Sequence, residues 1–240
     1  VPLGYEEKTT SNGWNVTSQT SRAPDLAFVT HVIEHLVQRS DVNAQVVLLG
    51  HSNGAALAHR LMIESDSPHI VGAVCLNTQL ATDQFHDGAF WRSNDRMYNE
   101  EAQPKSGRRI ALFVGQNDPI VTNEFSTAAG GFTSPAGPML SLEDSAHAWA
   151  VALSGDADLA KKPMSGMKVE YAPYVYAQAV ENAQHSIPDA VTMEGLHYAS
   201  DPAASSDSSW TVWVVGVLVV LIALAIVAKS GQRRRRPPYN

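Results

Sequence analysis

Cysteine is almost absent from this chain of 240 residues, because Cys75 is the only one. A single cysteine excludes an internal disulfide and any zinc site built on cysteine ligands. Cationic side chains are also scarce in most of the chain. The part up to Ser209 holds 12 lysines and arginines against 24 acidic residues, a net charge of −12. This charge argues against nucleic acid as a partner, because a phosphate backbone would be repelled.

Internal repeats are missing as well, and the composition is not that of a disordered chain or a fibrous rod. Apolar residues make up 44% of the sequence and charged residues 17%, which is enough apolar surface to bury a core. At roughly 150 residues per domain, the length favours one sizeable α/β domain, which we place at residues 1–198.

One long apolar segment stands near the C-terminal end, WTVWVVGVLVVLIALAIVA, at residues 210–228. As a helix it would be about 28 Å long, close to the ~30 Å hydrocarbon core of a bilayer. Trp210 and Trp213 suit the aromatic belt at a membrane interface. A buried core helix is the alternative, but core helices rarely lack a polar face. The segment therefore predicts a transmembrane helix with the lipid bilayer as its partner.

The charges around this segment predict its orientation. Four arginines, Arg233–Arg236, lie in the basic tail at residues 229–240, and the positive-inside rule places that tail in the cytosol. The acidic domain would then be lumenal or extracellular, joined to the membrane by a polar stalk at residues 199–209. A tail-anchored topology would instead require moving the arginines across the bilayer. Asn15 begins the only N-x-[ST] sequon and is a glycosylation candidate.

The domain alternates between apolar runs typical of strands and segments with helical periodicity. Such alternation predicts βαβ units and a mostly parallel sheet. Asp25 is expected to cap the first helix. The expected strands are residues 45–50, 70–76, 109–115 and 190–194. One expected helix begins at Asp25, and two others span residues 53–64 and 140–153. Residues 1–23 and 130–138 are expected as loops, 80–107 as a surface insertion, and 168–180 as either strand or helix.

The motif GHSNG lies between an expected strand and an expected helix, at Gly50–Gly54. In this context G-x-S-x-G predicts a nucleophile elbow, in which Ser52 stands on a sharp, strained turn clear of the sheet. Gly50 and Gly54 leave room for the strand and helix to cross. The Asn53 backbone N–H, at the positive end of the helix, would face a developing oxyanion. A serine in an ordinary βα turn is the alternative.

A serine nucleophile needs a base, and the base needs an acid that orients it. In this arrangement the acid follows the serine along the chain, and the histidine comes last. Asp118 directly follows the strand at 109–115, so it lies where open α/β sheets hold their sites. The rival candidates for the acid are Asp87, Asp95 and Asp144, and none of them directly follows a buried strand.

Nine histidines are candidates for the base. His197 is favoured because it follows the short expected strand at 190–194 and a glycine that bends the loop. His185 also comes late enough and is the rival. His51 flanks the nucleophile and is expected to shape the elbow. Packed or exposed roles suffice for the histidines on expected helices, namely His31, His35, His59 and His147.

Together these segments resemble the feruloyl esterase, acetylxylan esterase and polyhydroxybutyrate depolymerase group of α/β-hydrolases. The resemblance rests on GWN at 13–15 through Asp25, LLGHSNGAALAHRL, LFVGQNDPIV and VTMEGLHY. It implies cleavage of small-molecule or polymer-linked carboxylic esters through an acyl-enzyme, with no cofactor and no metal. It also implies Ser52 as nucleophile, Asp118 as acid and His197 as base.

The chain departs from that group before the elbow. Members carry several strands and a His-Gly oxyanion motif ahead of it, whereas the 45 residues here contain neither. We therefore expect an N-terminally incomplete chain with an unpaired sheet edge, and loss of an oxyanion donor typically lowers the rate by about 10²–10³-fold. Two functions stay open: a membrane-anchored serine esterase, favoured by the ordered triad, and a non-catalytic α/β-hydrolase-like ectodomain with a binding role.

Overall fold

The computed structural model describes residues 14–16, 23–42, 44–94, 97–116, 133–134, 137–165 and 168–180. Within these ranges the chain forms α1 (Asp25–Val37), β1 (Val46–His51), α2 (Asn53–Glu64), β2 (Ile70–Leu76), β3 (Phe85–His86), β4 (Ala89–Asn94), β5 (Met97–Ala102), β6 (Arg109–Gly115), β7 (Thr133–Ser134), β8 (Gly137–Pro138), α3 (Leu142–Ser154), β9 (Lys168–Tyr171) and β10 (Val175–Val180).

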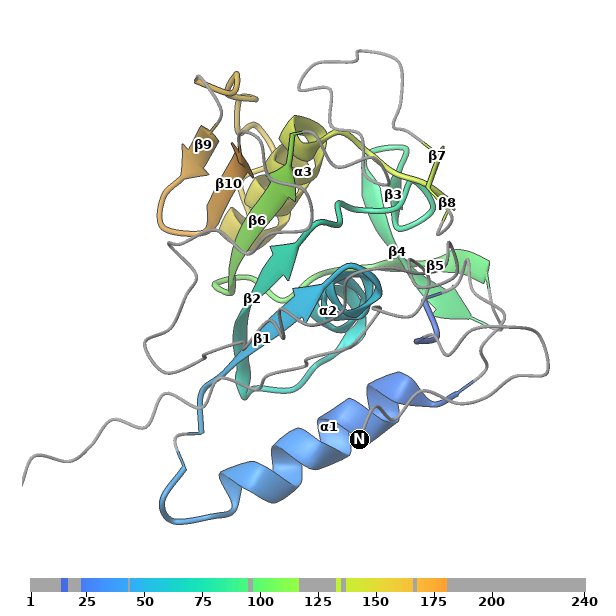
Figure 1. The fold of residues 1–240 in the computed structure, drawn as a ribbon, viewed down its shortest axis with the longest axis vertical. Coiled ribbons are helices and arrows are strands. Elements are labelled where there is room, and N and C mark those ends of the chain that lie inside the picture. Colours follow the sequence, from blue (N-terminus) through green and yellow to red (C-terminus); the bar gives the residue numbers. More distant parts are fainter. Residues whose placement is uncertain are drawn as a thin grey trace, which may run out of the picture.

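The centre of the molecule is a five-stranded sheet in the order β1-β2-β6-β10-β9 (Figure 1). The first four strands are parallel, and β9 pairs antiparallel with β10 at one edge. This confirms the predicted α/β class and the mostly parallel sheet. Because the four strands are parallel, their carboxyl ends meet at one edge of the sheet. Among the described residues no strand precedes β1, which forms the other edge.

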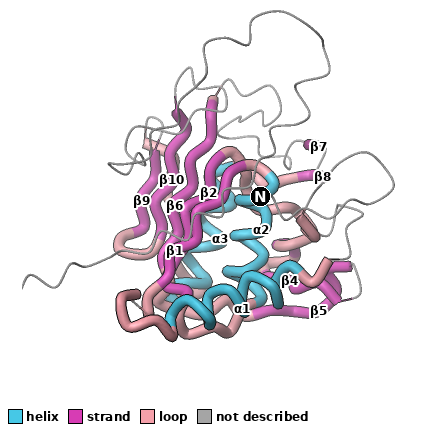
Figure 2. The backbone as a smooth tube through the Cα atoms, turned by 60° about the horizontal axis from the view of Figure 1, so that its bottom comes forward, coloured by secondary structure: helices cyan, strands magenta, loops and turns pink. Residues whose placement is uncertain are grey.

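Helices α2 and α3 cover one face of this sheet (Figure 2). Helix α2 packs on β1 and β2, and α3 packs on β6, β9 and β10. The side chains on the covered face are fully buried, and one row of them crosses all five strands in register: Leu48, Ala73, Ile110, Val175 and Tyr171. Removing this apolar surface from water is the main stabilising contribution to the layer.

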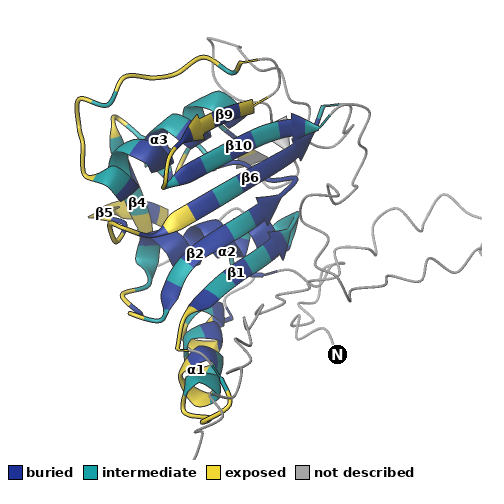
Figure 3. Cartoon of the chain, turned by 90° about the vertical axis from the view of Figure 1, so that its left-hand side faces the viewer, coloured by how far each residue is buried: buried dark blue, intermediate teal, exposed yellow. Residues whose placement is uncertain are grey.

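The other face of the sheet carries a second row, one residue further along the strands. Its members are Leu49, Val74, Ala111, Tyr176 and Glu170. The first four are only partly buried and Glu170 is exposed. Figure 3 looks onto this face, with α2 and α3 behind the strands. The alternation along β1 and β10 therefore separates a helix-covered face from a face that the described residues leave partly open.

The structure corrects two expectations for local structure and decides a third that was left open. The insertion at 80–107 forms an antiparallel sheet of β3, β4 and β5, with Phe90 against Trp149 at a ring distance of 4.7 Å. The ambiguous residues 168–180 are two strands joined by a turn, and the loop expected at 130–138 includes the two-residue strands β7 and β8. Apolar residues at the insertion pack into the core, which its polar average composition concealed.

Asp25 does not cap α1. Pro24 occupies the N-cap without a side-chain cap, and Asp25 is the first helical residue. Its carboxylate accepts the backbone N–H of Asn15 at 2.7 Å and is only 2% exposed. Burial raises the pKa of Asp25, although the hydrogen bond from Asn15 and the charge of Arg60 act in the opposite direction. The Asp25 side chain therefore holds the segment before the helix and does not cap the free N–H groups of the first turn.

The structure describes no residue after Val180. The strand expected at 190–194, the stalk at 199–209, the apolar segment at 210–228 and the tail at 229–240 therefore lie outside the described residues. Among the helices that are described, none is both long and apolar enough to cross a membrane.

Candidate active site at the Ser52 turn

The chain reverses sharply at Ser52, between the last residue of β1 and the first residue of α2. Ser52 has φ 51° and ψ −122°, a conformation that side-chain-bearing residues rarely adopt and that costs about 1–3 kcal/mol. Its N–H donates to the Leu76 carbonyl at 2.9 Å, which fastens the turn to the end of β2. The structure thus has the sharp strand–helix turn that the GHSNG motif predicts.

The first glycine of the motif, Gly50, permits this turn sterically. A Cβ on Gly50 would lie 2.3 Å from the carbonyl oxygen of Gly54, which is far inside van der Waals contact. The clashing atom belongs to the backbone, so no side chain can rotate away to relieve it. Strand β1 and helix α2 therefore approach each other more closely at Gly50 than any other residue would allow.

Helix α2 directs its amino end at the same place. The Ser52 carbonyl accepts hydrogen bonds from the N–H groups of Ala55 and Ala56, which starts the helix. The N–H of Asn53, the first helical residue, has no acceptor within the helix. That N–H and the positive end of the helix dipole favour a negative charge beside Ser52. The Asn53 N–H therefore adjoins Ser52, as expected from the sequence for an oxyanion donor, and that role stays a prediction.

A segment at Trp14–Val16, here called the strap, lies against α1 and α2. The Trp14 N–H donates to the Asn53 side-chain oxygen at 2.8 Å. The Asn15 carbonyl accepts a guanidinium N–H from Arg60, which also pairs with Glu64 at 2.7 Å. Trp14 and Val16 are buried in the main core. The strap thus fixes the side chain of the residue that follows Ser52.

Asn15 is the glycosylation candidate, and the structure describes the position of its side chain. It is partly buried, and Nδ2, the atom that would carry a glycan, donates to the Ala23 carbonyl at 3.1 Å. Glycosylation would leave Nδ2 one hydrogen for this contact. Modification of Asn15 stays a prediction.

Two residues that sequence reasoning missed hold the turn from the β2 side. The Thr78 hydroxyl donates to the Ser52 carbonyl at 2.8 Å. The Asn77 amide contacts the His51 ring at 3.2 Å through Nδ2 and accepts the Gly115 N–H at 3.2 Å. The available signal was their position directly after a buried strand. In a parallel sheet that position faces the ends of both neighbouring strands.

The other predicted site residues divide into two groups. Asp118, His197, Asp95 and His185 lie outside the described residues. The remaining acid rivals are engaged away from Ser52. Asp87 sits in the β3–β4 turn and contacts His86 at 3.0 Å, and Asp144 accepts from Ser141 at the start of α3. The geometry described here therefore includes the candidate nucleophile and oxyanion donor without the candidate acid and base.

The histidines expected on helices do lie on helices, and none of them is next to Ser52 in sequence. His31 and His35 are exposed on α1, and His147 on α3 contacts the Leu159 carbonyl at 2.8 Å. His59 on α2 is fully buried, and burial lowers its pKa to about 4. Its Nδ1 accepts the Trp149 indole N–H at 3.2 Å, so that nitrogen has no proton.

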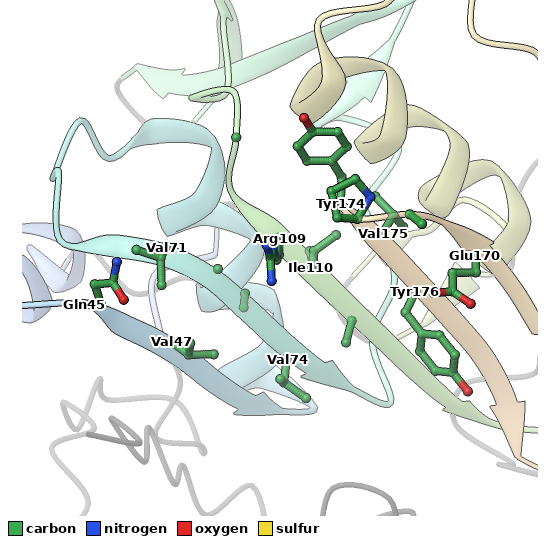
Figure 4. Close-up of a pocket in the computed structure, with 16 residues that line it drawn as sticks. Gln45, Val47, Val71, Val74, Arg109, Ile110, Glu170, Tyr174, Val175 and Tyr176 are labelled. Carbon is green, nitrogen blue, oxygen red and sulfur yellow. The ribbon is translucent and has the colours of Figure 1, made fainter. Parts of the chain in front are cut away.

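A depression of about 580 Å³ lies on the partly open face of the sheet (Figure 4). Its lining includes Val47, Val74, Arg109 and Tyr176, and none of it comes from the Ser52 turn. The candidate active site is at the carboxyl ends of the strands, so this depression is a separate feature and does not mark where an ester would react.

The described residues contain no group of three or more His, Cys, Asp or Glu side chains that could hold a metal ion. Burial raises the pKa of the Cys75 thiol, which contacts the Ala55 carbonyl. A thiol that stays protonated is a poor nucleophile.

Comparisons with protein-family models, curated proteins and solved structures find no match to this chain.

Proposed function

We propose that this protein is a membrane-anchored serine hydrolase that cleaves carboxylic esters through Ser52, Asp118 and His197. The observation that carries the proposal is the backbone of Ser52, which has a positive φ on a turn from strand to helix, beside a close backbone contact at Gly50. Backbone strain of this kind persists where surrounding structure enforces it, and it concentrates at functional sites.

In the proposed reaction His197 takes the Ser52 hydroxyl proton while the oxygen attacks the ester carbonyl carbon. The Asn53 N–H binds the resulting oxyanion. The C–O bond to the alcohol then breaks, and the alcohol leaves with the proton from His197. Water, deprotonated by His197, attacks the acyl-enzyme and releases the acid and free Ser52. Asp118 orients the imidazole and stabilises its cationic form.

Strand order supports Asp118 as the acid. Strand β6 lies two strands from β1, about 10 Å at the usual spacing, and both end at the same sheet edge. Asp118 follows Gly115, the last residue of β6, by three residues, and an extended chain of three residues spans at most about 10 Å. An acid at this position would therefore be within reach of a histidine beside Ser52.

The finer fold assignment and the location belong to the same proposal. The five strands would be the C-terminal part of an α/β-hydrolase sheet, with β1 as the strand before the nucleophile. Residues 210–228 would span the membrane and place the domain on the lumenal or extracellular side. Protease protection in closed vesicles tests this: the domain should resist digestion and the basic tail should be cut, whereas the opposite pattern would contradict it.

A fluorophosphonate probe tests the chemistry on the full-length protein in its membrane. The probe reacts with activated serines, so we expect one label that disappears in Ser52→Ala and falls strongly in His197→Ala. Ser154→Ala, at the end of α3, is the matched control and should label normally. A folded, complete protein without label would reject catalysis and leave the non-catalytic ectodomain as the better account.

A further inference from the structure

Asn77 directly follows β2, the strand that lies between β1 and β6 in the sheet. It is 4% exposed and has φ 53°, a left-handed conformation that Asn tolerates better than most residues. We propose that Asn77 is a positioning residue that locks the strand before Ser52 to the strand before Asp118. In the same contact it keeps His51 neutral, with the ring proton on Nδ1.

The orientation of the Asn77 amide follows from its partner on β6. The Gly115 N–H lies 3.2 Å from one end of the amide, and an N–H donor requires an oxygen there. The other end is therefore Nδ2, and it faces His51 Nε2 at 3.2 Å. An amide nitrogen only donates, so Nε2 must offer its lone pair. The imidazole of His51 then has its single proton on Nδ1.

The backbone of Asn77 adds a second link to β6. Its N–H donates to the Phe113 carbonyl at 2.7 Å. Asn77 therefore bonds to two residues near the end of that strand, Phe113 through its backbone and Gly115 through its side chain. His51 immediately precedes Ser52, and Gly115 is three residues before Asp118. The side chain of Asn77 therefore sets the distance between the two chain segments from which nucleophile and acid extend.

The neighbouring residue, Thr78, holds another histidine, His59, in the opposite tautomer. His59 contacts the Thr78 carbonyl at 3.2 Å through Nε2, which must donate, and accepts from Trp149 through Nδ1. Asn77 and Thr78 thus hold two neutral histidines in opposite tautomers. His59 lies in the core, whereas His51 adjoins Ser52, where a second imidazolium would repel the protonated base. This catalytic consequence rests on the proposed function.

The tautomer is tested by ¹⁵N spectra of histidine-labelled full-length protein in detergent micelles at pH 7, with His51 assigned by loss of its signals in His51→Gln. We expect shifts of a neutral ring protonated at Nδ1. In Asn77→Asp, which keeps the shape and tolerates the left-handed φ, the carboxylate cannot donate and should convert His51 to the imidazolium. A wild-type ring that is charged or protonated at Nε2 overturns the inference, and the only variant that this measurement needs is His51→Gln, for the assignment.

Positioning is tested by kinetics of ester hydrolysis. Asn77→Asp and Asn77→Gly, which preserves the backbone but removes the amide, should lower kcat roughly 10–100-fold with KM within about twofold. The control is Gln84→Glu, the same amide-to-acid change at a buried residue of the β3–β5 insertion, which should leave kcat and the His51 signals unchanged.

The two failures are distinguishable. Unchanged kcat in both Asn77 variants overturns the positioning role while the enzyme stands. A wild-type protein with no hydrolysis and no Ser52 label ends the proposed function and the positioning role together. The spectrum of the wild-type protein decides the His51 tautomer in either case.

Discussion

The covered face of the sheet and the turn at Ser52 adjoin on β1, but different forces maintain them. Leu48 belongs to an apolar row with almost no exposed surface, packed beneath α2 and α3. Four residues later, Ser52 has a strained backbone held by hydrogen bonds and by a backbone contact at Gly50. The covered row stabilises the fold, whereas the turn costs stability. Substitutions at the two places should therefore separate stability from activity.

The largest effect is expected at Gly50, where the two regions meet. Gly50→Ala places a methyl group 2.3 Å from the Gly54 carbonyl, so β1 and α2 must separate. We expect the free energy of unfolding to fall by about 3–5 kcal/mol, together with loss of the fluorophosphonate label. Urea denaturation measures the first and gel fluorescence the second. Near-normal stability would mean that the close crossing does not exist.

Leu48 and Leu49 give a matched comparison of the two faces. Leu48→Ala removes a side chain that is 1% exposed and should cost about 3 kcal/mol of unfolding free energy. Leu49→Ala changes the same residue type on the partly open face and should cost about 1 kcal/mol. Equal costs in urea denaturation would indicate that residues outside the described ranges cover the second face as fully as helices cover the first.

His59 connects the covered face to the end of β2, and its charge state should make stability depend on pH. Its pKa is lowered from 6.5 to about 4 by burial. Below pH 6.5 the unfolded chain binds a proton that the folded chain refuses, so the unfolding free energy falls as the pH drops toward 4. The loss should reach about 3 kcal/mol. Denaturation of wild type and His59→Gln at several pH values measures it, and equal slopes would contradict the assignment.

The smallest expected effect has the opposite sign at the turn. Ser52→Gly should raise the unfolding free energy by about 1 kcal/mol, because glycine adopts a positive φ without the strain of a side chain. Ser52→Ala keeps the strain and serves as control. Both variants should lose the label. A glycine variant no more stable than the alanine variant, compared by thermal denaturation, would show that the turn is not strained.

The sequence predicted those parts of the molecule whose signals are local. The strands at 70–76 and 109–115 and the helix at 53–64 appear in the structure at those bounds, because each carries an apolar run or helical period of its own. The turn at Ser52 was predictable because the steric demand at Gly50, against the backbone of Gly54, falls within five residues.

Long-range partners explain what was missed. Asp25 resembled a helix cap, but its partner is the N–H of Asn15, ten residues earlier. Asn77 binds residues 26 and 38 positions away, and only strand order brings them together. Residues 168–180 were ambiguous because β9 and β10 are short and pair with each other across a turn. Asp118 and His197 stay predictions.

The strap has a mechanical consequence for α2. It contacts Arg60 through the Asn15 carbonyl and Asn53 through the Trp14 N–H, so it runs alongside almost two turns of the helix. Helices fray first at their ends, and these two hydrogen bonds should keep the first turn of α2 from opening. The strap, three residues in neither strand nor helix, thereby maintains the direction of the helix dipole that faces Ser52.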